Sequence, residues 1–202
     1  MKNLYLILLL TILYGCKKND SVSVPTISVS LPNRPALGSF NYGGIVFYIL
    51  KSGDVGYDPK VWHGLVFANT RIENKYWGCY DVLIPNANST LLGDGKLNTF
   101  NISKSCPGLP ENTASYCQNL VVNGYDDWYL PTKDELQKIH DNRISLQSMP
   151  NISFPTNHPY ASSSQIDSKT FYAIRFAKSD LQWFSQLKSA PYYASAIPIR
   201  AF

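Results

Sequence analysis

The sequence has no strong or clustered charge. Its 202 residues carry a formal net charge of +4, and 16% of them are charged. The basic residues are scattered along the chain, whereas a nucleic-acid-binding domain usually gathers them on one face. We therefore exclude nucleic acid from the expected partners.

Motifs that carry catalysis or bind metals are also missing. The chain has no Gly-x-Ser-x-Gly elbow, no glycine-rich phosphate loop and no Cys-x-x-Cys pair. Its histidines, His63, His140 and His158, are far apart in the sequence. Asp126 and Asp127 are adjacent, so in an extended segment their side chains point to opposite faces and cannot act as a paired acid and base. We therefore predict no enzymatic activity, no cofactor and no metal site.

No apolar run is long enough to span a bilayer as a helix. Residues 4–13 form the clearest run, and they fall short of the roughly 20 residues that a spanning helix needs. A run of this length after a basic N-terminus suits a signal peptide, which we assign to residues 1–15. The run ends in Leu13-Tyr14-Gly15-Cys16, which resembles the lipobox of bacterial lipoproteins.

The lipobox resemblance implies cleavage before Cys16 and a lipid anchor on that residue. The alternative is an ordinary secretory leader followed by a chance cysteine. Both interpretations place the mature protein outside the cytoplasm, and the first one attaches it to a membrane. We therefore expect a lipid-anchored protein of the cell envelope, at the outer membrane and facing the periplasm or the cell surface.

Cysteine is scarce in the rest of the chain, which contains Cys79, Cys106 and Cys117. In an oxidising compartment two of them are expected to form a disulfide, and three pairings are available. Cys106 and Cys117 are the closest in sequence. We therefore predict a bridge between these two, with Cys79 as the alternative partner.

The remaining chain divides into a tether and one domain. Residues 16–37 contain Pro25, Pro32 and Pro35, which keep the chain extended. Residues 21–30 alternate serine with apolar residues, but no turn signal supplies a partner strand. Strand and helix patterns begin after this stretch, so we place the domain at residues 38–202.

Strand patterns lie at both ends of this domain, and helix patterns lie in its middle. Strands are predicted within residues 42–50, 63–68, 171–177, 181–187 and 193–202. Pro198 places the last of them at a sheet edge or a bulge. Two helices are predicted, one beginning at residues 110–111 and one after residue 132. Residues 97–103 also fit a short helix within a long irregular stretch from 69 to 110. The pattern indicates the α+β class.

Residues 123–136 form the predicted corner at which the irregular middle joins the second of these helices. Thr132 and Glu135 have the spacing of a capping box, in which each side chain satisfies a backbone N–H of the other residue. Pro131 keeps the residue before it out of the helical region. We assign these three residues, together with Asp127 and Trp128, a structural role at this corner.

Several short motifs occur along the chain in a recognisable order. They are Gly43-Gly44-Ile45-Val46, His63-Gly64-Leu65-Val66, Trp77-Gly78-Cys79, Gly93-Asp94-Gly95, Asp127-Trp128-Tyr129-Leu130-Pro131, Ser162-Ser163-Ser164 and Arg200-Ala201-Phe202. In this order they resemble the Lcl C-terminal domain family, named for a collagen-like bacterial adhesin, over residues 38–202. The resemblance implies a C-type-lectin-like fold with small antiparallel sheets, two helices, long irregular loops, and first and last strands that pair.

The resemblance also implies an extracellular binding domain, because the adhesin's domain is associated with sulfated polysaccharides. We accordingly expect a glycan or an extracellular protein as ligand. The candidate ligand surface consists of Trp62, Trp77, Asn98, Ser162, Ser163, Ser164 and Arg200. Ala161 and the pair Ile197-Pro198 depart from the family pattern and remove groups that would contact a ligand. The alternative is a structural adhesin or fimbrial accessory component without a small ligand, and an enzyme acting on exported substrates ranks third.

Overall fold

The computed structural model describes residues 33–202, except 110, 151, 156–158, 177–180 and 190–192. The predicted signal peptide, the predicted lipidation site Cys16 and most of the predicted tether lie outside the described residues. Within the part of the chain that is described, no helix is long and apolar enough to cross a membrane.

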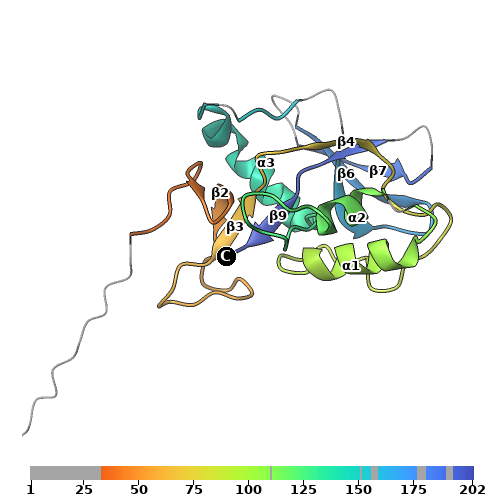
Figure 1. Cartoon of the computed structure of the whole chain (residues 1–202), viewed down its shortest axis with the longest axis horizontal. Coiled ribbons are helices and arrows are strands. Elements are labelled where there is room, and N and C mark those ends of the chain that lie inside the picture. The colour runs from red at the N-terminus through yellow and green to blue at the C-terminus, as the bar shows by residue number, and fades with distance from the viewer. Residues whose placement is uncertain (1–32, 110, 151, 156–158, 177–180, 190–192) are drawn as a thin grey trace, which may run out of the picture. The chain divides into compact units, whose positions relative to one another are not determined.

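The first sheet combines strands from both ends of the domain. It contains β1 (Phe40–Asn41), β2 (Gly44–Ile49), β3 (Gly64–Phe67) and β9 (Ile199–Ala201), in the order β1-β2-β3-β9, and all neighbours are antiparallel (Figure 1). The expected pairing of the first and last strands is wrong in detail. β9 does join the sheet of β2, but it pairs with β3, which lies between them.

A strained turn joins β1 to β2. Its two residues, Tyr42 and Gly43, have φ values of 53° and 80°. Such turns match the twist of the paired strands, but a bulky residue at positive φ is unusual. The Tyr42 ring stacks on Phe202, with ring centroids 3.9 Å apart and 5° between the planes, and its carbonyl accepts a hydrogen bond from Arg200. These contacts with the far edge of the sheet hold Tyr42 in place.

The second sheet has five strands. It contains β4 (Ile72–Lys75), β5 (Tyr160–Gln165), β6 (Thr170–Phe176), β7 (Leu181–Leu187) and β8 (Ala194–Ala196), in the order β4-β8-β5-β6-β7. β5 and β8 are parallel, and the other neighbours are antiparallel. The predicted strand at 193–202 is therefore two strands, β8 and β9, which belong to different sheets and are separated at Pro198. β4 and β5 were not predicted.

Among the described residues, three helices accompany the sheets: α1 (Gly95–Ser105), α2 (Thr113–Gln118) and α3 (Lys133–Gln147). The α+β class is confirmed, and the described residues form three helices in place of the two expected. The additional helix is α1, which includes and extends the stretch 97–103.

Helix α3 joins the two sheets through the largest apolar cluster. Its side chains Leu136, Ile139 and Leu146 are fully buried. They pack together with residues of β2 and β3 from the first sheet and of β5 and β6 from the second: Ile45, Phe47, Tyr48, Leu65, Phe67, Tyr160, Ile174 and Phe176. One helix thus contributes to the core of both sheets.

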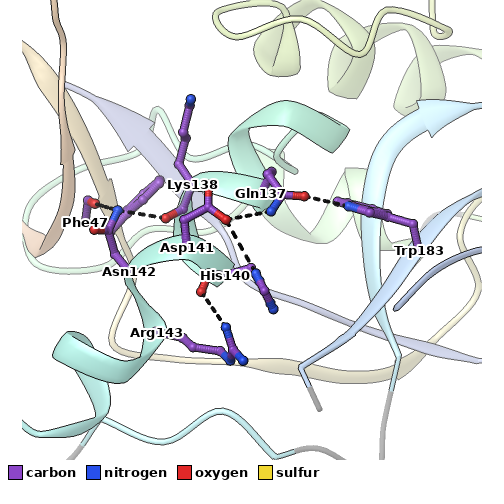
Figure 2. A network of polar contacts seen from close by, with 8 residues as sticks. All are labelled: Phe47, Gln137, Lys138, His140, Asp141, Asn142, Arg143 and Trp183. Carbon is purple, nitrogen blue, oxygen red and sulfur yellow. Dashed lines mark hydrogen bonds and ion pairs between the residues drawn. The ribbon is translucent and has the colours of Figure 1, made fainter. Parts of the chain in front are cut away.

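Polar contacts fix α3 to both sheets as well. Asn142 donates from Nδ2 to the carbonyl of Phe47 in β2 at 3.1 Å, and Trp183 of β7 donates from Nε1 to Oε1 of Gln137 at 2.7 Å. Gln137 in turn donates from Nε2 to Asp141 at 2.6 Å. Figure 2 shows that these side chains project from one stretch of α3 toward strands on either side of it.

A second apolar cluster holds the long loop of residues 76–94 against the second sheet. Trp77 is fully buried there, donates from Nε1 to the carbonyl of Ser162 and stacks on Phe171. Lys188 is also buried, and its Nζ lies 4.7 Å from the centroid of the Trp77 ring. The same ammonium group donates to Val82 O, in the loop, at 3.0 Å. Burial lowers the pKa of Lys188 to about 8.

The disulfide closes this loop onto the end of α1. Cys79 and Cys106 are bonded, with their Cα atoms 5.3 Å apart. The predicted bridge between Cys106 and Cys117 is therefore wrong, and the alternative partner Cys79 takes part instead. Cys117 is a free thiol that points from α2 into the core, where burial raises its pKa. Closeness in sequence does not decide the pairing here, because the fold brings Cys79 to Cys106 across 27 residues.

Candidate functional site

Residues 125–132, within the predicted corner at 123–136, extend the first sheet and lead into α3. Tyr129 exchanges two backbone hydrogen bonds with Ile199 of β9, at 2.8 and 2.9 Å. Trp128 is 2% exposed and covers the face of the first sheet opposite to α3, against residues such as Val46 and Val66. The predicted capping box is confirmed: Glu135 N–H donates to Thr132 Oγ1 at 3.2 Å, and Thr132 N–H donates to Glu135 Oε2 at 2.8 Å.

Glu135 also fixes the start of α1. Its Oε1 accepts a hydrogen bond from the N–H of Gly93 at 3.0 Å and one from the hydroxyl of Tyr129 at 3.3 Å. The carboxylate is fully buried, and burial raises its pKa to about 7 although these donors and Thr132 favour the charged form. Thr99 adds a second contact between α1 and the corner, because its hydroxyl accepts the N–H of Leu130 at 2.9 Å. The corner and α1 are therefore held rigidly together.

Arg200 locks the corner to the last strand. Its guanidinium donates to both carboxylate oxygens of Asp127, at 2.5 and 3.0 Å, and to the carbonyl of Tyr42 at 2.8 Å. It also lies 3.9 Å from the centroid of the Tyr125 ring. Partial burial alone would raise the pKa of Asp127, but the hydrogen bonds and charge of Arg200 outweigh it and hold that pKa below its ordinary value.

A groove opens between this corner and the two short helices. Its volume is about 360 Å³. We call it the α1 groove; α1 lines it with Lys96, Thr99 and Phe100, the end of α2 with Gln118, and the corner with Asp126, Asp127, Trp128 and Tyr129. Trp128 and Tyr129 are buried and form its floor, whereas the ring of Phe100 is 48% exposed.

Three polar side chains of the groove are not engaged in hydrogen bonds within the described structure. Lys96, Gln118 and Asp126 are exposed, and their side chains make no hydrogen bond to any residue that the structure describes. Together they present an ammonium group, a carboxamide and a carboxylate beside the Phe100 ring. A ligand could therefore both donate and accept hydrogen bonds there.

A second hollow, of about 260 Å³, lies between β3, the stretch after it and residues 152–154. Phe67 and Phe154 line it, and Arg71 is its charged group. Arg71 is already bound, because it pairs with Glu73 and donates to the carbonyl of Ser153. With its charged group engaged, this hollow is the weaker candidate.

The ligand surface expected from the sequence is mostly inaccessible. Five of its seven residues are at most 1% exposed: Trp77, Asn98, Ser162, Ser163 and Ser164. They join elements internally; for example, the hydroxyl of Ser164 donates to Ser89 O at 2.7 Å. Arg200 is engaged by Asp127, and Trp62 is half-buried beside Arg34 and does not line the α1 groove. The expectation of a ligand surface on the five buried residues is therefore wrong.

The groove residues were missed for identifiable reasons. Lys96 and Phe100 are four residues apart, which places them on one face of a helix, but the helix itself was only weakly indicated. Asp126 and Asp127 are adjacent, and adjacent carboxylates in an extended segment point apart. That argument holds, since Asp127 binds Arg200 and Asp126 faces solvent. Asp126 nevertheless lines the α1 groove, where it belongs to the wall formed by the corner.

The groove and the fold around it can be compared with a known protein family. The family model for the Lcl C-terminal domain matches residues 67–197. The chain belongs to this family. The range matched to the Lcl C-terminal domain contains all three helices and every residue of the α1 groove, whereas β1, β2 and β9 lie outside it.

Comparisons with individual proteins add little to this assignment. No curated protein matches the chain. Among solved structures, a fimbrial protein from Bacteroides ovatus ATCC 8483 is similar over 77% of this chain, with 14% sequence identity and a TM-score of 0.45. This chain spans 43% of that structure's length. A likeness at this level carries no argument about function, so the α1 groove has to be interpreted from its own chemistry.

Proposed function

We propose that this protein is a lipid-anchored envelope protein whose Lcl C-terminal domain binds a carbohydrate in the α1 groove. The observation that carries the proposal is the exposed Phe100 ring beside unpaired donor and acceptor groups. A sugar ring has apolar faces that pack on an aromatic ring, and its hydroxyls donate and accept hydrogen bonds. Ligand sites typically combine an apolar surface with a few placed polar groups in this way.

The charges of the groove favour a sugar without strong negative charge. Lys96 and Asp126 have opposite charges, and Asp127 is neutralised by Arg200. A polysulfated chain would gain little from such a balanced surface and would be repelled by Asp126. The sulfated ligands associated with the adhesin that names the family are therefore not part of this proposal.

The proposed role is binding without catalysis. The two carboxylates in the groove differ in environment, but Asp127 is held as a carboxylate by Arg200 and Asp126 is open to solvent. Neither is placed to exchange a proton with the other over a bound substrate, because one points inward and the other outward.

Binding is tested with the mature chain, residues 16–202, carrying Cys16→Ser so that it stays soluble without a lipid. A glycan array identifies ligands, and titration calorimetry then measures their affinities. Phe100→Ala should weaken binding about tenfold, equivalent to about 1.4 kcal/mol. Phe40→Ala is the matched control, because Phe40 is 58% exposed and lies outside the groove. Equal affinities of the two variants, or a blank array, would refute the proposal.

A further variant separates neutral from anionic ligands. Asp126→Asn removes the carboxylate charge and keeps a hydrogen-bonding group. A neutral sugar should bind this variant with little change, whereas a sulfated chain should bind it more tightly than the parent. Tighter binding of sulfated chains by the variant, without any binding of neutral sugars, would contradict the ligand class that we propose.

The membrane anchor is a separate part of the proposal and rests on the lipobox-like sequence before Cys16. Cys16→Ala in the full-length chain should move the protein from the membrane fraction to the soluble fraction of cells. Continued membrane association of this variant would refute a lipid on Cys16.

A second candidate function is a structural component of an envelope assembly. One specific observation favours it, namely a sheet edge in the second sheet that is suited to pairing. Recovery of a stoichiometric protein partner by cross-linking in cells, together with a blank glycan array, would favour this function over carbohydrate binding.

A further inference from the structure

The outer edge of the second sheet is a long strand without edge protection. β7 ends the strand order β4-β8-β5-β6-β7, and its residues Leu181–Leu187 include no charged residue and no proline. Proteins usually protect such edges with charges, prolines, bulges or very short strands. β7 has none of these features, and its register with β6 runs without interruption over all seven residues.

The register identifies which backbone groups of β7 are free. Lys188 N–H donates to Lys169 O at 2.9 Å, and these two residues continue the β6–β7 register. Hydrogen-bonded pairs alternate along an antiparallel ladder, so Phe184 and Gln186 also direct their backbone groups toward β6. The backbone groups of Trp183, Ser185 and Leu187 therefore point away from the sheet, and they bond to no residue that the structure describes.

Both faces of β7 are partly covered by other elements of the fold. Trp183 is held on one face by its hydrogen bond to Gln137 of α3, as Figure 2 shows. On the other face Phe184 packs beside the second apolar cluster, and Gln186 and Lys188 are buried. A partner would accordingly meet the strand at its edge and not on a face.

The sequence of the strand specifies what that partner is. It reads Leu-Gln-Trp-Phe-Ser-Gln-Leu, which is almost the same in both directions about Phe184. In antiparallel pairing with a second copy centred on Phe184, leucine would face leucine, glutamine would face glutamine, and bulky Trp183 would face small Ser185. This register also places the outward-facing residues Trp183 and Ser185 opposite each other, as a hydrogen-bonded ladder requires.

We propose that β7 pairs with β7 of a second copy of this chain about a two-fold axis at Phe184. The pairing joins two five-stranded sheets into one of ten strands. A two-fold contact is isologous: if one residue of β7 contacts a second residue on the partner, that second residue contacts the first one in return. The assembly therefore closes as a dimer. This inference is independent of the carbohydrate proposal, because the α1 groove contains no residue of β7.

The oligomeric state gives the first test. The Cys16→Ser mature chain should sediment as a dimer in analytical ultracentrifugation at high concentration and dissociate on dilution. Ser185→Pro removes an outward-facing N–H without removing a bond to β6, and proline is tolerated at sheet edges. This variant should remain folded by circular dichroism and be monomeric throughout the same concentration range. A monomeric parent, or a dimer that persists in Ser185→Pro, would overturn the proposal.

The register gives the second test, and it does not depend on the proline variant. Residue 184 would face itself in a non-hydrogen-bonded pair, with Cα atoms about 4.5 Å apart, which is within disulfide range. Phe184→Cys should therefore oxidise to a covalent dimer. Ser185→Cys is the matched control, because residue 185 faces residue 183 and not itself.

Phe184→Cys should cross-link at least about tenfold faster than Ser185→Cys, because only its paired thiols meet at high effective concentration. Equal rates would refute the register. Cross-linking that appears only when residues 21–30 are deleted would instead identify that strand-like segment as the occupant of the edge, and would also overturn self-pairing.

Discussion

Replacing Gly95 by alanine would insert a methyl group between two buried side chains. A Cβ at this position would meet Oε2 of Glu135 and would lie 2.7 and 2.8 Å from two carbons of the Tyr129 ring. Real Cβ atoms are not found this close to other atoms, so something has to move. Glu135 is fully buried and Tyr129 is 5% exposed, so neither side chain can swing into solvent.

The expected cost combines two effects. Overpacking a well-packed site costs about 1–3 kcal/mol. Displacing the Glu135 carboxylate also weakens its hydrogen bonds from Gly93 and Thr132, and a buried polar group left unsatisfied costs about 1–3 kcal/mol. We therefore expect Gly95→Ala to lower the free energy of unfolding by about 2–6 kcal/mol, which corresponds to a Tm about 4–24 °C lower in a domain of this size.

Urea unfolding of the mature chain with its disulfide intact measures this effect. Gly108→Ala is the matched control, because a Cβ at residue 108 would have no neighbour within 4 Å and its φ is not in the left-handed region. That variant should be neutral or stabilised by up to about 1 kcal/mol, since alanine restricts the unfolded chain. If the two variants unfold at the same urea concentration, Gly95 does not make the close approach to Glu135 that holds α1 at the corner.

Three further outcomes are expected. Trp128→Ala should lower the free energy of unfolding by about 3–5 kcal/mol because the ring is buried, and an unchanged urea midpoint would place the ring at the surface. Glu135 has a folded pKa of about 7, above its unfolded value, so it stabilises the fold at acidic pH and this stabilisation is lost as the pH rises through 7. Glu135→Gln should flatten the stability profile between about pH 5 and pH 8, and parallel profiles for parent and variant would contradict this. Peptide mapping of the non-reduced protein should recover Cys79 linked to Cys106, whose loop adds about 3.5 kcal/mol on the chain-entropy model, and a disulfide peptide containing Cys117 would be inconsistent with the structure.

Elements encoded by neighbouring residues could be predicted from the sequence. The capping box at Thr132 and Glu135 depends on a spacing of three residues, and it forms as expected. β2, β3, β6 and β7 follow β-branched and aromatic runs that lie within the predicted ranges or one residue beyond them. In each case the physical cause is local, so the pattern is visible in the sequence.

β5 could not be predicted because its polar residues give no strand pattern in the sequence. Ser162, Ser163 and Ser164 lie in a fully buried strand, where a strand pattern would place apolar residues. Their polar groups are satisfied by segments distant in sequence: Ser162 donates to Tyr172 O, and the N–H of Ser163 donates to Pro131 O. Such burial is acceptable because tertiary structure supplies these partners, and no window of sequence contains that information.

The same limit applies to the candidate ligand surface. Aromatic and polar residues of the irregular middle of the chain were expected at the surface, but Trp77 and Asn98 turn inward while Phe100 and Lys96, on the same helix as Asn98, turn outward. Which face of α1 is buried depends on the Glu135 contact at its start and on the disulfide at its end. Both of these constraints connect residues far apart in the sequence.

The division of residues 194–201 between two sheets has a consequence for the order of folding. β8 lies between β4 and β5 in one sheet, and β9 forms the edge of the other sheet beyond β3. Neither sheet is complete until this segment has been synthesised, although the remaining strands precede it along the chain. Contacts of such high sequence separation slow folding. An unfinished chain exposes open sheet edges, so the topology keeps the chain incompletely folded until its C-terminal segment is available.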